Sequence, residues 1–163
     1  MKGLDKLINL RRINLSHNRI EKMESIGNCK LLEELNLEDN LIGCISNLEK
    51  LVFLKNLQLG KNKITKIEGI STLINLTQLS LEDNQLLVLE GLSELKGLME
   101  LYLGNNKIVD SKEVKSLKDL QKLIILDMSG NPLSKDSSYR IFTLYVLKKL
   151  KVLDGISIER FEQ

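Results

Sequence analysis

Apolar residues recur along this chain in an eleven-residue phrase. Leucine or isoleucine fills most of its first, fourth, sixth and eleventh positions, and asparagine fills the ninth. A clean copy runs from Leu54 to Ile64. Four successive steps are 22 residues long and the last is 25, since copies begin at Leu10, Leu32, Leu54, Leu76, Leu98 and Leu123. A fixed period of this length predicts a solenoid of stacked repeats.

Each repeat divides into two halves with different apolar spacing. The phrase contains Leu-x-Leu, which is the period-two pattern of a short strand, and strands that run the same way in every repeat pair in parallel. The second half carries an apolar residue at every third position, as in the series Ile64, Ile67, Ile70, Leu73 and Leu76. Spacing of three favours 3₁₀ turns or irregular coil. The predicted fold is therefore an α/β solenoid, a curved horseshoe arc with a concave parallel sheet and a short 3₁₀ or irregular convex side.

The recurring asparagines fall where each predicted strand ends. A carboxamide both donates and accepts hydrogen bonds, so a stacked column of them can pair backbone groups that the turns would otherwise bury unpaired. We expect a structural role for these residues, which are Asn18, Asn40, Asn62, Asn84, Asn106 and Asn131.

The long step and the C-terminal section depart from the regular pattern. Asp110–Glu113 matches a capping box, and the apolar stripe that follows predicts a helix of about three turns. Ser137 or Ser138 is expected to cap a second helix ending near Leu147, as a lid on the last repeat. Leu150–Gly155 is expected to add a final edge strand. We therefore divide the chain into repeats at 1–133, the first one partial, and a C-terminal helical cap at 134–163.

The first residues already belong to the repeat, since residues 3–10 align with residues 69–76. Solenoid ends normally need a capping element, because an uncovered end exposes core to water. We expect this chain to be a segment of a longer array, and the alternative is that another chain covers the end.

Composition limits the cellular compartments and the classes of partner that fit this chain. Twenty-four basic and 22 acidic side chains give a net charge of +2, which favours neither nucleic acid nor membrane. Two unmatched cysteines, Cys29 and Cys44, suit a reducing compartment. Charge interrupts the N-terminus and no apolar run reaches the ~18 residues of a membrane span. We expect an intracellular protein, in the cytoplasm with cilium or nucleus as alternatives.

The residues that carry chemistry are too scattered for an enzyme. His17 has a carboxylate neighbour in Asp39 but no third group to complete a nucleophile–base arrangement. Metal ligands are too few and there is no glycine-rich phosphate loop. We predict no catalytic, metal-binding or cofactor-binding residues.

The spacing and the asparagine position resemble the leucine-rich repeat family. The 22-residue back half resembles the subfamily of the nuclear regulatory subunit of protein phosphatase one. The C-terminal section, which includes Asn131–Pro132 and Leu150–Gly155, resembles the cap of the spliceosomal A-prime protein and of ciliary leucine-rich-repeat proteins. Lys148 or Lys149 stands where that cap often has proline. The resemblance implies an intracellular scaffold that binds proteins on its concave sheet.

Two features of the predicted concave face are candidates for binding. Charges of opposite sign alternate between repeats, and the alternative reading is that these charges pair with one another across strands. Met99, Tyr102, Ile124 and Ile125 form an apolar cluster where earlier repeats are polar, and the alternative is that the cap covers the isoleucines. The remaining candidate protein-binding residues are Gln58, Lys61, Glu82, Asp83 and Asp127.

The predicted function is a protein–protein interaction scaffold that binds a partner on the concave sheet. The alternatives are a regulatory subunit of a protein phosphatase and a ribonucleoprotein assembly factor. We expect a protein partner, no direct contact with nucleic acid or membrane, and a monomer.

Overall fold

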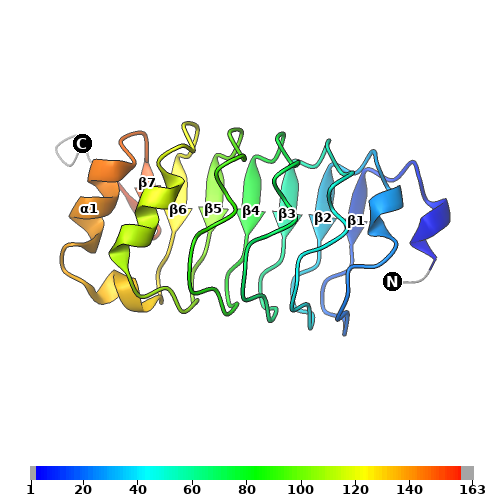
Figure 1. The fold of residues 1–163 in the computed structure, drawn as a ribbon, viewed down its shortest axis with the longest axis horizontal. Helices are drawn as coiled ribbons and strands as arrows, with labels where there is room; N and C mark the ends of the chain where they lie inside the picture. The colour runs from blue at the N-terminus through cyan, green and yellow to red at the C-terminus, as the bar shows by residue number, and fades with distance from the viewer. Residues whose placement is uncertain (1–2, 159–163) are drawn as a thin grey trace.

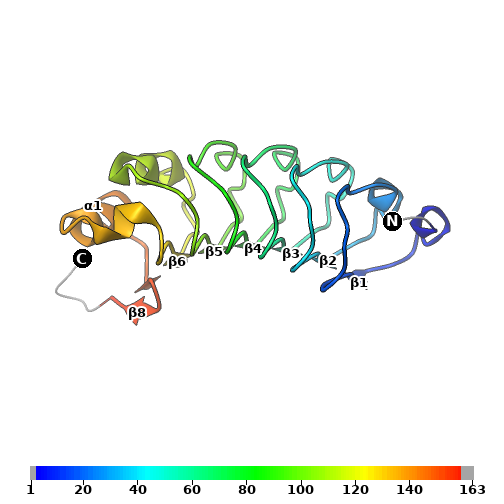
Figure 2. The ribbon, with the colours of Figure 1, turned by 90° about the horizontal axis from the view of Figure 1, so that it is seen from below.

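The chain forms an arc of parallel strands, seen from two directions in Figures 1 and 2. A computed structural model describes residues 3–158 of the 163. The strands pair in chain order, with Arg12 opposite Glu34 and Glu34 opposite Asn56, so each repeat sits in register on the next. The predicted solenoid with its concave parallel sheet is confirmed. Its six repeat strands are β1 (Arg12–Asn14), β2 (Glu34–Asn36), β3 (Asn56–Gln58), β4 (Gln78–Ser80), β5 (Glu100–Tyr102) and β6 (Ile125–Asp127).

One continuous aliphatic core runs between the sheet and the convex side. The middle residue of each strand points into it, and Leu57 and Leu79 have no exposed surface. The leucines and isoleucines of the back half pack against these residues in the same core cluster. Removing a leucine such as Leu57 by substitution with alanine should cost about 2–5 kcal/mol, because the neighbouring repeats hold the cavity open.

The strands are only three residues long because each is followed by a turn with positive φ. The left-handed residue comes three positions after each strand ends, as at Lys61 and Asp83, both with φ of 53°. Asp and Asn tolerate this region better than most residues do. The side chains at these positions therefore lie on the turns beside the sheet and not on the strands. Fewer of the alternating charges expected on the concave face thus lie on the strands themselves.

The asparagines bridge successive repeats as expected. The Asn62 amide nitrogen donates to the carbonyl oxygens of Leu37, Leu59 and Gly60, and its Oδ1 accepts the Ile42 N–H at 3.0 Å. The same bonds recur at the other central repeats. Each buried carboxamide thus pairs backbone groups of two repeats.

The convex side is made of short 3₁₀ helices and turns. These helices are η1 (Leu4–Lys6), η2 (Ile26–Asn28), η3 (Ser111–Leu117) and η4 (Pro132–Lys135). Glycine is required at one convex turn, because a Cβ on Gly91 (φ 87°) would lie 2.1 Å from the Ile67 carbonyl oxygen. Repeats therefore stack as closely on the convex side as a backbone contact allows.

The helix expected after Asp110 is shorter than predicted. It is the seven-residue 3₁₀ helix η3 and not three turns of α-helix. Asp110 caps it by accepting the Lys112 N–H at 2.8 Å. The Glu113 carboxylate accepts the Leu89 N–H of the preceding repeat instead of completing a capping box. The Glu113 side chain thus links the 25-residue repeat to the preceding one. The local sequence around Glu113 does not indicate this contact.

The C-terminal section closes the last repeat with a helix and a hairpin. Helix α1 (Tyr139–Val146) packs against η3 and η4. Ser138 is the N-cap residue as predicted, but its hydroxyl donates to Asp136 and forms no capping bond to the helix. Ile141 and Tyr145 are each 74% exposed, which makes only part of α1 a lid.

The predicted final edge strand is followed by one more strand. β7 (Val152–Leu153) extends the parallel sheet beside β6. β8 (Ile156–Ser157) then turns back antiparallel to β7 and forms the edge. Figure 2 shows this hairpin below α1 at the C-terminal end of the arc.

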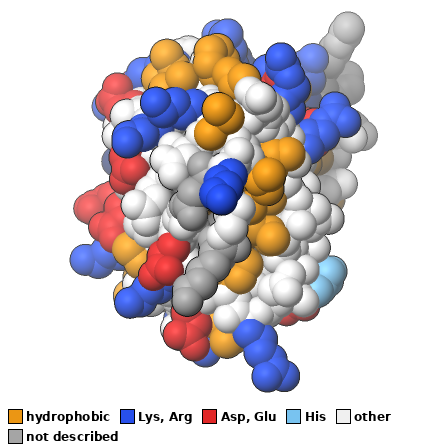
Figure 3. Space-filling view, turned by 90° about the vertical axis from the view of Figure 1, so that its right-hand side faces the viewer, with side chains coloured by type: hydrophobic (Ala, Val, Ile, Leu, Met, Phe, Trp, Pro, Cys, Tyr) orange, Lys and Arg blue, Asp and Glu red, His pale blue; other side chains and the backbone are white. Residues whose placement is uncertain are grey.

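The opposite end of the arc leaves core side chains open. Leu7 is 46% exposed, whereas its equivalents Leu51 and Leu73 are fully buried. Leu4 and Leu10 are half-buried for the same reason. Figure 3 looks onto this end and shows hydrophobic side chains in a column down it.

Candidate protein-docking surface

The concave surface is made by the outer residues of each strand and the turns that follow. On each strand the first and third residues flank the buried middle one. The register sets Tyr102 of β5 between Ser80 of β4 and Asp127 of β6. Neighbouring strands lie about 4.8 Å apart, so these side chains form one continuous surface.

Ion pairs neutralise the part of this surface formed by β1–β3. The carboxylate of Glu33 contacts both Arg11 and Lys55, and these hydrogen bonds, with Lys55 the larger contributor, lower the pKa of Glu33. Further ion pairs join Arg12 to Glu34 at 3.1 Å and Lys61 to Glu38 at 2.8 Å, and the His17 ring is hydrogen-bonded to the Asp39 carboxylate at 2.8 Å. The cross-strand pairing that was the alternative reading is therefore present here.

The part formed by β4–β6 carries carboxylates without such cations. Within residues 3–158, no lysine, arginine or histidine lies in ion-pair distance of Glu82, Asp83, Glu100 or Asp127. Their hydrogen bonds come from nearby neutral groups, namely the Ser80 hydroxyl on Glu82 and the Ser129 N–H on Asp127. This half of the concave surface is acidic.

Tyr102 lies within this acidic region. Its hydroxyl donates to the Glu100 carboxylate at 2.9 Å. Burial, the bond to Glu100 and the charges of Glu82 and Asp127 raise the pKa of Tyr102 to about 12. The phenol therefore stays protonated at neutral pH and presents an aromatic ring among carboxylates.

An apolar strip borders the acidic region. Met99 is 39% exposed, and its carbonyl oxygen accepts the N–H groups of Ile124 and Ile125. Both isoleucines are half-buried, so the structure covers them only in part. Val152 of β7 pairs with Ile125 and extends the strip, a neighbour that sequence analysis missed because β7 lies outside the regular repeats.

The remaining two candidates lie apart from this centre. Gln58 and Lys61 belong to β3 and its turn, on the neutralised half. Glu38 holds the Lys61 ammonium and raises its pKa, so this cation is already engaged. Gln58 lines a shallow hollow of about 380 Å³ over β1–β3, whose other polar lining is Arg12, Asn14, Glu34, Asn36 and Asn56.

Sequence analysis also missed an exposed apolar row on the turns that precede the strands. Val52, Phe53 and Ile74 are 40%, 51% and 61% exposed. The signal was present, because Ile8, Val52 and Ile74 are spaced by multiples of the 22-residue period.

The described residues offer little catalytic chemistry. Residues 3–158 contain no group of three or more His, Cys, Asp or Glu side chains placed to hold a metal ion. The exposed Cys44 thiol donates to Glu68 at 3.2 Å, which raises the pKa of Cys44. A thiol held protonated is a weak nucleophile.

The match to a family model covers nearly all of the chain. Residues 12–163 match the model described as Leucine-rich repeat. The chain belongs to the leucine-rich repeat family. The match does not distinguish the subfamilies that the sequence resembles.

Solved structures share the leucine-rich repeat fold. An internalin from Listeria monocytogenes is 24% identical, with a TM-score of 0.75, and the match covers 92% of this chain and 48% of the internalin. A leucine-rich repeat protein of Leptospira interrogans is 28% identical, with a TM-score of 0.68, and the match covers 91% and 44%. A chain of the Drosophila melanogaster SNF/U2A′ complex is 21% identical, with a TM-score of 0.68, and the match covers 93% and 76%. This chain thus spans less than half of the two bacterial proteins.

Leucine-rich repeat proteins are typically protein–protein interaction scaffolds, and they are generally not enzymes. Among the described residues, no helix has the length and apolar character needed to cross a membrane.

Proposed function

We propose that this leucine-rich repeat arc binds a partner protein on its concave sheet, with the contact centred on β4–β7. The observation that carries the proposal is the asymmetry of charge pairing. Carboxylates over β1–β3 form ion pairs, whereas over β4–β6 none lies in ion-pair distance of a cation of residues 3–158. Such a region is complementary to cations on a partner, which would steer association and fix its orientation.

The apolar strip supplies the part of such an interface that gives affinity. Met99 and Ile125 are partly exposed and are joined by a backbone hydrogen bond, and Tyr102 lies on β5 two residues after Glu100, the residue opposite Ile125. Aromatic and large aliphatic side chains within a polar rim are the usual hot spots of protein interfaces. The partner segment that fits combines lysine or arginine with apolar side chains.

The hollow over β1–β3 adds a polar end to this surface. Asn14, Asn36, Asn56 and Gln58 present amide groups there, which can pair with a partner's backbone. We therefore place the partner across the arc, with its apolar and basic part over β4–β7.

The experiment compares two double variants with a matched control. Tyr102→Ala with Ile125→Glu, and Glu82→Lys with Asp83→Lys, should each abolish capture of partners in a pull-down while the melting temperature stays close to that of the parent. The control, Glu90→Lys with Glu94→Lys on the convex side, changes the charge by the same amount as the second variant and should capture normally. Loss of capture in the control alone would place the site outside the concave sheet and contradict the proposal.

The identity of the captured protein separates the kinds of scaffold. We propose that the chain is a segment of a larger intracellular protein. The pull-down is run on lysates of ciliated and of non-ciliated cells, and the proteins recovered from the two are compared. Recovery of a phosphatase catalytic subunit would favour a phosphatase regulatory subunit. Recovery of a ribonucleoprotein component would favour an assembly factor, an alternative supported by the similarity to a chain of the SNF/U2A′ complex.

A further inference from the structure

The turns that lead into the strands form a continuous edge along the arc, which we name the entry rim. It consists of residues 8–9, 30–31, 52–53, 74–75, 96–97, 121–122 and 148–149, which occupy equivalent places in successive repeats. Stacking is direct, since the Asn75 amide donates to the Val52 carbonyl oxygen at 2.8 Å. In Figure 1 these turns form the upper edge of the molecule.

The N-terminal half of the entry rim is apolar and exposed. Exposed fractions are 56% for Ile8, 39% for Leu31, 40% for Val52, 51% for Phe53 and 61% for Ile74. Single exposed apolar residues are ordinary, but a contiguous row over four repeats marks an interaction surface. The end view in Figure 3 shows hydrophobic side chains along this upper edge.

The C-terminal half of the same rim is basic. Its exposed residues Lys122, Lys148 and Lys149 carry no acidic neighbour within the rim, and the flanking positions in segments 118–123 and 146–151 add Lys118 and Lys151 against one carboxylate, Asp119. None of these lysines forms an ion pair with a carboxylate of the described residues. The Lys148 ammonium lies 6.0 Å from the centre of the Tyr145 ring and remains exposed.

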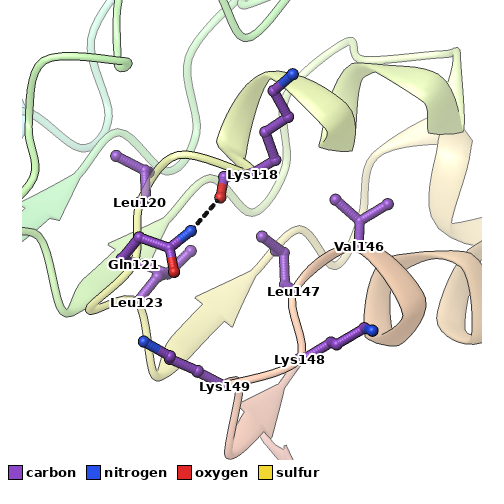
Figure 4. Close-up of a pocket in the computed structure, with 8 residues that line it drawn as sticks. All are labelled: Lys118, Leu120, Gln121, Leu123, Val146, Leu147, Lys148 and Lys149. Carbon is purple, nitrogen blue, oxygen red and sulfur yellow. Dashed lines mark hydrogen bonds between the residues drawn. The ribbon is translucent and has the colours of Figure 1, made fainter.

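A groove of about 240 Å³ separates the two basic segments. Leu120 and Leu123 line one wall, and Val146 and Leu147 line the other (Figure 4). Lys149 extends along the open side between the walls, whereas Lys118 points away from the groove along η3. The groove thus offers an apolar floor to a side chain whose neighbours are acidic.

We propose that the entry rim is a second docking surface, which binds an acidic amphipathic helix of a partner protein. The basic half of the rim is complementary to carboxylates on the partner helix, and the apolar half is complementary to a hydrophobic stripe on it. Repeats lie about 4.8 Å apart and an α-helix rises about 5.4 Å per turn, so each helical turn meets about one repeat. Six repeat steps span about 29 Å, the length of a helix of about 19 residues.

The concave sheet and the entry rim attract opposite charges. The acidic concave region selects a basic segment, whereas the rim selects an acidic one. The entry-rim proposal therefore stands or fails independently of the proposed concave function.

The test is selection from a displayed library of 20-residue peptides of helix-favouring composition, against the intact chain. We expect enriched peptides with glutamate or aspartate in one half and a leucine, isoleucine or phenylalanine stripe in the other. The best peptide should shift the NMR signals of residues 30–31, 52–53, 121–122 and 148–149. Failure to enrich acidic peptides, or shifts confined to the strands on adding an enriched acidic peptide, would overturn the proposal. Basic peptides that shift only strand signals would report on the concave surface instead.

Matched variants assign the two halves of the rim. Phe53→Glu with Ile74→Glu should abolish binding of the selected peptide. Lys122→Glu with Lys149→Glu should weaken it at least about tenfold at low salt. The corresponding controls off the rim, Leu87→Glu with Val109→Glu and Lys66→Glu with Lys107→Glu, should bind normally, and equal losses in the controls would contradict the assignment.

Two other occupants are distinguished by the same variants. Sedimentation of the free chain as a dimer that Phe53→Glu with Ile74→Glu dissociates would make a second copy the occupant. Co-sedimentation with phosphatidylserine vesicles that Lys122→Glu with Lys149→Glu abolishes would make it a lipid surface. Either result would overturn the partner-helix proposal, whereas the concave variant Tyr102→Ala with Ile125→Glu should leave peptide binding intact.

Discussion

At the scale of single residues, the asparagines do what their chemistry and spacing predict. A carboxamide supplies an acceptor and two donors, and the buried turns require both. Asn40, Asn62, Asn84, Asn106 and Asn131 are all buried, whereas Asn18 of the first repeat is exposed and its side-chain amide donates to the carbonyl oxygens of Leu15 and Ser16 in its own repeat. Asparagines at equivalent positions therefore contribute different amounts to the free energy of unfolding along the arc.

Substituting Asn62 by leucine should destabilise the fold strongly. The Ile42 N–H would be left buried without its acceptor, which costs about 1–3 kcal/mol. The carbonyl oxygens of Leu37, Leu59 and Gly60 would each lose one of their bonds and keep those from Asn40, Asn84 and the Asp39 N–H. Asn18→Leu, at an exposed position, should cost less than about 1 kcal/mol. Urea unfolding followed by circular dichroism measures both, and similar losses would show that bridging between repeats is not the source of the stability.

The Cys44 thiol should react more slowly than an ordinary exposed thiol. Its hydrogen bond to Glu68, burial and the carboxylate charge raise its pKa above that of an ordinary exposed thiol, so less thiolate is present at pH 8. Glu68→Gln removes the charge and should lower the pKa of Cys44 and speed its alkylation by iodoacetamide. Cys29 is fully buried and should not react in the native protein. An unchanged rate, measured by mass spectrometry across pH 7–10, would exclude Glu68 as the cause.

At the scale of elements, the regular repeats could be predicted from the sequence and the irregular ones only in part. A period of 22 residues fixes both the buried leucines and the parallel register, because equivalent residues must stack. The long step does not repeat, so its structure depends on a contact with another repeat. Glu113 bonds to Leu89, 24 residues earlier, and no local capping rule contains that information.

The same distinction explains the candidate site. Met99, Tyr102 and Ile125 were predictable because they break the polar pattern of equivalent positions. The ion pair of Lys61 was not, since it depends on the Lys61 side chain reaching Glu38 of the adjacent repeat, while the charge of Asp83 adds only a smaller effect on the Lys61 pKa. The entry rim was overlooked for another reason. Its apolar residues are periodic too, but turn positions are expected to be polar. Sequence spacing alone does not show which apolar side chains on the turns are exposed.

At the scale of the whole molecule, the arc has unlike ends and unlike faces. Helix α1 and the β7–β8 hairpin pack against the last repeat, whereas Leu7 at the first repeat is 46% exposed. In a solenoid each repeat is stabilised by its two neighbours, so stability depends on position along the array. An end that lacks a covering neighbour opens more readily than the centre.

Hydrogen exchange of the 163-residue chain should therefore show a gradient along the sheet. The Leu15 and Leu81 N–H groups make equivalent bonds, 2.8 Å to Asn36 and 2.8 Å to Tyr102, at the first strand and at the centre. Because bond geometry is the same, a difference in exchange reports the free energy of local opening. We expect Leu15 to exchange at least about tenfold faster than Leu81, and Leu103 near the cap to behave like Leu81. Equal rates at all three amides, followed by NMR, would mean that the arc opens as one unit and that its exposed end costs no local stability.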